Sequence, residues 1–132
     1  MFYELSITTK AHTEFVDITD MINESISKSG IKKGVCYIYV PHTTAGVTIN
    51  ENADPDVVYD MLNQLNKIVP FEDNYRHMEG NSAAHIKASM MGFSQHVIIN
   101  NGNLVLGTWQ GIYLTEFDGP RRRKVYLKLM EG

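Results

Sequence analysis

The fold class is decided most clearly by residues 112–130, which read IYLTEFDGPRRRKVYLKLM. Residues 112–117 and 124–130 are rich in β-branched, aromatic and other apolar residues, as strands are. Gly119 and Pro120 lie between the two runs, and this pair is typical of a turn. We therefore expect a β-rich domain whose last two strands form an antiparallel hairpin.

Outward from this stretch, strand and helix patterns are mixed. Alternating or continuous apolar residues predict further strands, at residues 1–10, 35–40, 47–49, 97–99 and 104–106. The run at 35–40 is apolar throughout, which predicts a strand covered on both faces. Apolar residues at helical spacing predict three helices, at residues 18–29 before Gly30, 54–69 before Pro70, and 82–91. The sequence thus predicts one α+β domain over residues 1–132, a two-sheet β-sandwich with two or three helices packed on it.

Composition excludes several classes of protein. Hydrophobic residues make up 43% of the 132 positions, charged residues 20%, and the formal net charge is -3. An acidic chain is a poor general binder of nucleic acid, because phosphate neutralisation needs clustered Lys and Arg. No apolar run approaches the ~20 residues of a membrane helix, so we expect no membrane association. Residues 1–10 lack the pattern of a signal peptide, and Cys36 is the only cysteine, so we expect a cytoplasmic protein.

Side chains that can do chemistry are concentrated in three stretches, the first of which is residues 41–56. Its candidates are an imidazole, two hydroxyls, two amides and three carboxylates: His42, Thr43, Thr44, Asn50, Asn52, Glu51, Asp54 and Asp56. Asp54 before Pro55 is a helix cap, and Asp56 suits the positive end of the helix dipole. Three carboxylates within six positions can also hold a divalent cation through oxygen ligands.

The second stretch, residues 77–85, places His77 and His85 on either side of a Gly-Asn-Ser turn that begins a helix. Two histidines around Glu79 and a helix cap at Asn81 indicate a metal site or an acid–base site. The spacing matches no established zinc pattern. A solvated or hydrogen-bonded histidine is the alternative at each position.

The third stretch, residues 108–123, contains Trp109, Gln110, Arg121 and Arg123. Either arginine can clamp a phosphate or carboxylate with two hydrogen bonds, unless it pairs with the acidic residues of the same turn. Trp109 can stack on a planar ligand or fill the core. Arginines, a helix N-terminus, hydroxyls and clustered carboxylates together predict a small, anionic, phosphorylated ligand. The chain has no Walker loop and no dinucleotide-binding glycine motif, which disfavours the large nucleotide-binding folds.

Taken together, three blocks resemble the signature blocks of the YjbQ-like family. They read HTTAGVTINENADPDV at residues 42–57, EGNSAAHIK at 79–87 and GTWQGIYLTEFDGPRRR at 107–123. The resemblance covers essentially the whole chain. It implies a β-sandwich with helices, assembled as a homotrimer, and a secondary thiamine-phosphate synthase activity. That reaction joins hydroxymethylpyrimidine diphosphate to thiazole phosphate and releases diphosphate.

The roles of individual residues in such a reaction are our hypothesis from side-chain chemistry. Glu51, Asp54 and Asp56 would recruit Mg²⁺ for turnover, and Arg121 and Arg123 would hold phosphate. His42 and His85 would act on the ligand, and the amides and hydroxyls would contact it: Asn50, Asn52, Asn81, Gln110, Thr43 and Thr44. His42, His77 and His85 would instead bind a transition metal such as Zn²⁺ in either of two alternatives. One alternative is a non-enzymatic trimer that binds a metal or an anion, and the other is a metal-dependent phosphoester hydrolase.

Overall fold

The computed structural model describes all 132 residues, which form eight strands and three helices. Their order is β1 (Phe2–Thr8), β2 (Glu14–Asp17), α1 (Thr19–Ser29), β3 (Gly34–Tyr39), β4 (Ala45–Glu51), α2 (Pro55–Ile68), α3 (Ser82–Met91), β5 (Ser94–Asn100), β6 (Asn103–Leu104), β7 (Gln110–Glu116) and β8 (Arg122–Glu131). All three predicted helices are present. The short strand β2 has no clear sequence signal and was not predicted.

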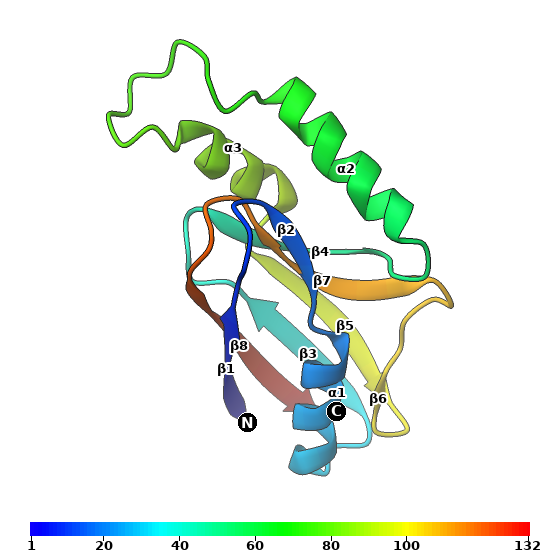
Figure 1. Cartoon of the computed structure of the whole chain (residues 1–132). Coiled ribbons are helices and arrows are strands. Elements are labelled where there is room, and N and C mark those ends of the chain that lie inside the picture. The colour runs from blue at the N-terminus through cyan, green and yellow to red at the C-terminus, as the bar shows by residue number, and fades with distance from the viewer.

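The strands form two antiparallel sheets that face one another (Figure 1). The larger sheet has the order β1-β8-β3-β5-β6 and the smaller one the order β2-β7-β4. Eighteen buried apolar residues fill the space between them, and α1 contributes Ile22 and Ile26 to this core. Burial of this apolar surface is the main favourable contribution to folding. The predicted α+β architecture of two sheets with packed helices is confirmed.

The predicted final hairpin is wrong, although its strands are present. β7 pairs with β2 and β4 in the small sheet, whereas β8 pairs with β1 and β3 in the large sheet. The turn after β7 therefore carries the chain from one sheet to the other. The preceding hairpin, β5 with β6, is antiparallel as expected. Asn101 and Gly102 have the positive φ values, 52° and 75°, that a tight turn between such strands requires.

The strand predicted at residues 35–40 is covered on one face only. Along β3 buried residues alternate with less buried ones, and Tyr37 and Tyr39 keep 47% and 51% of their surface exposed. These rings lie on the outer face of the large sheet, away from the core. Apolar side chains continue across that face on the neighbouring strands.

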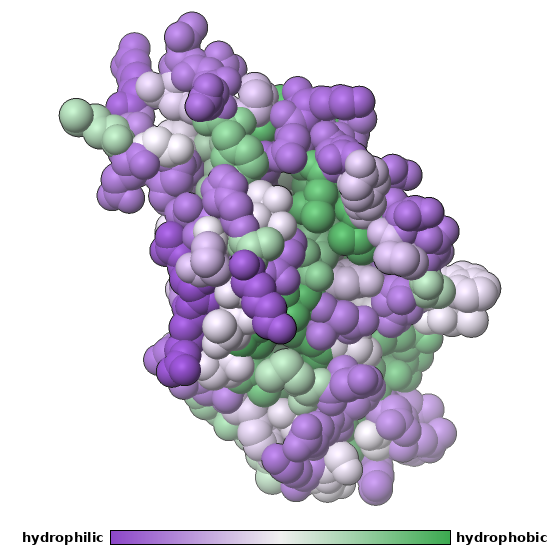
Figure 2. Space-filling view, in the orientation of Figure 1, coloured by the Kyte–Doolittle hydropathy of each residue, from purple (hydrophilic) through white to green (hydrophobic).

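Helices α2 and α3 form a third layer over the small sheet (Figure 1). α3 lies so close to β4 that a Cβ at Gly46 would stand 2.6 Å from the carbonyl oxygen of Gly92, so only glycine fits there. Of the apolar stripe on α2 only Leu65 is buried. Figure 2 shows hydrophobic residues gathered beneath α2, within a face that is otherwise largely hydrophilic. No helix of the structure combines the length and the apolar character needed to cross a membrane.

Candidate functional site

One end of the small sheet, together with the loops beside it and the start of α3, encloses a pocket of about 460 Å³. Eight polar residues and no hydrophobic residue line it: Thr43, Thr44, His77, Glu79, Asn81, His85, Asp118 and Arg121. Six of the eight are candidates from the sequence, and the other two are Glu79 and Asp118. The β3–β4 loop, the segment before α3 and the turn after β7 thus converge although they are far apart in the chain.

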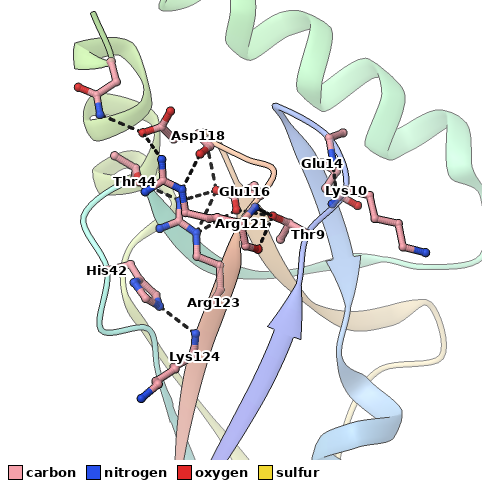
Figure 3. A network of polar contacts seen from close by, with 12 residues as sticks. Thr9, Lys10, Glu14, His42, Thr44, Glu116, Asp118, Arg121, Arg123 and Lys124 are labelled. Carbon is pink, nitrogen blue, oxygen red and sulfur yellow. Dashed lines mark hydrogen bonds and ion pairs between the residues drawn. The ribbon is translucent and has the colours of Figure 1, made fainter. Parts of the chain in front are cut away.

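A buried ion pair lies beside the pocket (Figure 3). Glu116, at the end of β7, is fully buried, and Arg123, at the start of β8, is 2% exposed. Arg123 Nε donates to both carboxylate oxygens of Glu116 at 2.9 and 3.1 Å, and its Nη2 contacts Oε2 as well. Arg123 does not line the pocket, so it is not free to act as the predicted phosphate clamp. Its partner is a carboxylate of the same chain.

The Glu116 carboxylate also holds neighbouring parts of the site. It accepts hydrogen bonds from Thr9 Oγ1 at 2.7 Å and from the backbone N–H of Asp118 at 3.1 Å. Thr9 Oγ1 in turn accepts from the backbone N–H of Arg121 at 2.9 Å. Burial alone would raise the pKa of Glu116, but the hydrogen bonds from Arg123, Thr9 and Asp118 and the charge of Arg123 outweigh it and lower the pKa.

Arg121 is the arginine that reaches the pocket. Its Nη2 lies 3.2 Å from Asp118 Oδ2, and its Nε donates to the carbonyl oxygen of Asp118 at 2.8 Å. Half of the Arg121 side chain is exposed, at 50%. On the other side of Asp118, Asn81 Nδ2 donates to the same carboxylate oxygen at 2.9 Å. Asn81 Oδ1 is buried and accepts no hydrogen bond from the protein.

The N-terminus of α3 adds backbone donors. Asn81 is the N-cap residue, yet its side chain bonds Asp118 and makes no cap hydrogen bond. The backbone N–H groups of Ser82 and Ala83 donate to no protein acceptor, and the first turn contains no acidic residue. Free N–H groups and the positive end of the helix dipole favour an anion at this position.

His77 and His85 lie together, as their sequence positions suggested. Their ring centroids are 5.6 Å apart and the ring planes are nearly perpendicular, at 89°. His77 Nε2 also lies 4.0 Å from Glu79 Oε2. No three His, Cys, Asp or Glu side chains converge to form a metal-binding group. The predicted metal set of His42, His77 and His85 is therefore not assembled within one chain.

His42 faces away from this pair. Its Nε2 accepts a hydrogen bond from the backbone N–H of Lys124 at 2.9 Å (Figure 3). Burial and the nearby charge of Arg123 lower the pKa of His42, so the neutral imidazole is favoured. With Nε2 acting as an acceptor, the ring proton resides on Nδ1. His42 lines a separate, smaller hollow with Thr43 and Phe93, not the polar pocket.

The remaining candidates gather at the opposite end of β4. Four of them have a local hydrogen-bond partner for the side chain: Asn50, Asn52, Asp54 and Gln110. Asn50 Oδ1 accepts from the N–H of Glu51, and Asp54 caps α2 by accepting from the N–H of Asp56, as predicted. Asn52 Nδ2 donates to an oxygen of Asp17 at 3.4 Å. In the same region Gln110 Oε1 accepts from the backbone N–H of Gly107, and Trp109 is 63% exposed, outside the core.

A strand length separates this set from the pocket. β4 has seven residues, and a strand advances about 3.3 Å per residue, so its ends lie roughly 20 Å apart. Glu51, Asp54 and Asp56 therefore cannot act on the same small ligand as Arg121 within one chain. The structure brings together the hydroxyl, histidine and arginine candidates and keeps the predicted carboxylate set apart.

The predicted site residues did not include Glu79, Asp118, Glu116 or Thr9. The acidic residues of the turn, Glu116 and Asp118, were expected only as alternative ion-pair partners of the arginines, and both pairs are formed. Glu79 and Asp118 lie within the two stretches that were singled out, but each resembles an ordinary turn or loop acid. Glu116 had a usable signal, because it is a lone carboxylate within the apolar run of residues 112–117. A charge in a strand that is buried on both faces needs a partner, and Arg123 is the one that the fold provides.

The chain is similar to several known proteins over almost its full length. Residues 3–132 match the family model described as UPF0047 protein YjbQ-like. UPF0047 protein YugU of Bacillus subtilis is 55% identical over 131 residues, which cover 98% of this chain and 99% of the relative. A UPF0047 protein of Methanocaldococcus jannaschii is 54% identical over 130 residues, covering 98% and 94%.

Solved structures agree with these sequence matches. A YjbQ/UPF0047 family protein of Clostridium acetobutylicum superposes with a TM-score of 0.95 at 55% identity, covering 97% of this chain and 99% of that one. A YbjQ-like protein of Sulfolobus solfataricus gives the same TM-score at 33% identity, covering 100% and 97%. The names of these relatives state a family and no activity. The chain belongs to the YjbQ-like (UPF0047) family.

Proposed function

We propose that this chain binds a small phosphorylated ligand in the polar pocket and acts as a transferase that releases diphosphate. The observation that carries the proposal is the lining, in which Arg121, Thr44 and the N-cap residue of α3, Asn81, border a pocket with no hydrophobic residue. The free N–H groups of Ser82 and Ala83 directly follow Asn81 in the chain. A guanidinium, a hydroxyl and free backbone N–H groups are the donors that phosphate oxygens require. The reaction proposed is that of a thiamine-phosphate synthase, in which a pyrimidine diphosphate and a thiazole phosphate are joined.

The charge of the pocket favours a divalent cation as cofactor. One guanidinium faces the two carboxylates of Glu79 and Asp118, so an incoming phosphate meets net negative charge. Mg²⁺ is commonly bound through one or two carboxylates together with the phosphates of the substrate. The donor set fits such an ion, because the carboxylates of Asp118 and Glu79 line the same pocket. Asp118 and Glu79 would hold the ion together with the phosphate oxygens, and the bound ion would neutralise the leaving diphosphate.

Within one chain this placement replaces the earlier assignment of Mg²⁺ to Glu51, Asp54 and Asp56, which lie at the far end of β4. The protein's own groups have separate tasks in the proposal. Arg121 and the N-terminus of α3 bind and orient the phosphate, and His85, in the first turn of that helix, holds or moves a proton at a ligand oxygen.

We propose further that the chain assembles as a homotrimer. The outer face of an antiparallel sheet is ordinarily polar, because solvent covers it. Here that face carries Phe2, Tyr37, Tyr39, Ile98 and Met130, each between 47% and 60% exposed. Lys128 and His96 lie among these side chains. So many exposed apolar side chains on one sheet face indicate a surface that another molecule covers, and a second copy of the chain is the occupant that we propose.

A trimer would also give the far end of β4 a role. The carboxylates and amides near Glu51 cannot reach the pocket of their own chain, but a neighbouring copy can present them to it. Asp56→Asn and Arg121→Ala would then each be inactive alone. When the two variants are mixed in equal amounts and reassembled, an active site needs intact Arg121 from one chain and intact Asp56 from its neighbour. With random assembly this occurs at roughly a quarter of the subunit interfaces. An active Asp56→Asn variant would place Asp56 outside the site, and two inactive variants that recover no turnover on mixing would refute a site shared between neighbouring chains.

The first experiment is an assay of diphosphate release with the two substrates, with and without Mg²⁺. We expect turnover that needs both substrates and the metal, and that is lost in His85→Ala and Arg121→Ala. Asp20→Asn is the matched control for Asp56→Asn, because both are acids in the first turn of a helix and Asp20 lies on α1. Absence of turnover, together with a stoichiometric transition metal in the purified protein, would overturn the proposal in favour of a metal-binding or hydrolase role.

A further inference from the structure

We infer that the buried Glu116–Arg123 pair is a positioning device that holds the hydroxyl of Thr44 as a free hydrogen-bond donor at the pocket, and that this donor selects an oxyanion as the ligand group next to Thr44. The inference rests on the proposed function, because it assumes that the pocket binds phosphate. It assigns roles to two residues, Glu116 and Arg123, that do not line the pocket themselves.

The first step is the direction of one hydrogen bond. Arg123 Nη2 lies 2.8 Å from Thr44 Oγ1, and a guanidinium nitrogen can only donate. The threonine oxygen is therefore the acceptor, and the hydrogen of its own hydroxyl is left to find another partner. Thr44 is 4% exposed and lines the pocket, and its hydroxyl donates to no protein group. A buried donor without a partner is costly, so the ligand is the group that completes it.

The second step is the rigidity of the arginine. Both hydrogens of Nη2 are used, one by Thr44 and one by Glu116, while Nε donates to Glu116 as well. The carboxylate of Glu116 is saturated in turn by Arg123, Thr9 and the N–H of Asp118. Neither member of the pair can rotate without breaking several charge-assisted hydrogen bonds. The Thr44 oxygen is therefore held in place, with one of its lone pairs occupied, before a ligand arrives.

The third step concerns the ligand. A threonine hydroxyl has one hydrogen and two lone pairs, and Arg123 occupies one of the lone pairs. The hydrogen still needs an acceptor, and the nearby guanidinium charge disfavours a cationic ligand group. A charged oxygen therefore suits this position best. The same carboxylate fixes the backbone of Asp118 and, through Thr9, the N–H of Arg121. The pair thus holds three pocket residues in place: Thr44, Asp118 and Arg121.

Calorimetric titration with inorganic pyrophosphate, in the presence of Mg²⁺, tests the inference. Thr44→Val removes the donor at nearly constant volume and should weaken binding by about tenfold or more, the usual effect of losing a hydrogen bond to a charged group. Thr44→Ser keeps the donor and should bind nearly as the wild type does. The matched control is Thr115→Val, because Thr115 is a buried β7 residue whose hydroxyl makes no hydrogen bond and does not line the pocket.

A double-mutant cycle separates positioning from plain stability. Arg123→Lys keeps the positive charge beside Glu116 but removes the guanidinium N–H that donates to Thr44, so it should weaken pyrophosphate binding. If Arg123 acts through Thr44, the same change in a Thr44→Val background should have little further effect. Additive losses would contradict the inference. Thr44→Ala serves in place of Thr44→Val if the valine variant does not fold.

The outcomes distinguish the two proposals. If the wild type binds pyrophosphate and Thr44→Val binds it equally well, the positioning role is wrong and the proposed function stands. Equal losses in Thr44→Val and Thr44→Ser would also overturn it, because the hydroxyl would then not be the reason. No binding of pyrophosphate by the wild type would overturn both.

Discussion

Removing the charge of Glu116 should destabilise the protein severely. Glu116→Gln keeps the shape of the side chain but leaves the guanidinium of Arg123, only 2% exposed, without a counter-charge. Its amide group also places N–H donors where Arg123 and Thr9 need acceptors. Breaking a buried ion pair on one side costs about 3–5 kcal/mol. Against a typical domain stability of about 5–15 kcal/mol, this is a large fraction, and we expect Tm to fall by roughly 10–20 °C.

A second variant shows whether the cost comes from the uncompensated charge. Glu116→Leu combined with Arg123→Met removes both charges and keeps apolar volume in their place. Such replacements of a complete pair are often neutral or stabilising, so the double variant should be more stable than Glu116→Gln. It should nevertheless fail to bind pyrophosphate tightly, because Thr44 has lost the group that holds it in place. Urea denaturation at a fixed protein concentration measures the stabilities.

The same pair predicts an acid dependence of stability. The pKa of Glu116 is lowered below its ordinary value of 4.5, so the unfolded state binds a proton more readily than the folded state does. The stabilisation is therefore complete above the unfolded pKa and is lost as the pH falls through the lower, folded pKa. The stability gap between wild type and Glu116→Gln should shrink between pH 5 and pH 3. A gap under about 1 kcal/mol at pH 7, or one independent of pH, would refute the reasoning.

Three further predictions follow from other parts of the fold. Lys87 is fully buried, with Nζ 2.6 Å from Asn66 Oδ1 and 3.6 Å above the Phe71 ring, and burial lowers its pKa from 10.5 to about 8. Between pH 8 and 10.5 the lysine is protonated in the unfolded state but largely neutral in the folded state. The free energy of unfolding should therefore rise across this range by up to about 3 kcal/mol. Denaturation experiments at several pH values should show this rise for the wild type and not for Lys87→Met. Burial raises the pKa of the Cys36 thiol to about 12. A thiol reagent should therefore label Cys36 only at the rate at which the protein unfolds. Rapid labelling of the native protein would contradict this. Light scattering at ~10 μM should give a mass near three times 15.0 kDa, and a mass close to one chain would refute the trimer.

The elements of the fold were predictable because their signals are local. Ile18, Ile22 and Ile26 recur at helical spacing, and Gly30 ends that helix with the left-handed φ of 76° that favours glycine. The cap at Asp54 is formed as the sequence indicated. Which strands pair is not local. β7 and β8 have a turn between them that is typical of a hairpin, yet each finds its partners in a different sheet. The pairing depends on how the two sheets pack against one another, and the residue pattern of a single strand does not show which strand it will pair with.

The candidate site shows the same division between local and long-range information. Thr44, Asn50 and Glu51 are neighbours in the sequence and were grouped for that reason, but an extended strand moves residues seven positions apart by roughly 23 Å. Thr44, His85 and Arg121 are far apart in the chain, and the fold places them around one pocket.

Proximity in a strand-rich sequence is thus a poor guide to a shared site. The two polar ends of β4 can act on one small ligand only if a second chain supplies one of them. For this reason the oligomeric state bears directly on the chemistry: a protein that is monomeric and active would need the pocket residues alone to suffice. A trimer whose mixed variants regain activity would instead assign the Glu51 end of one copy and the Arg121 end of the next to the same reaction.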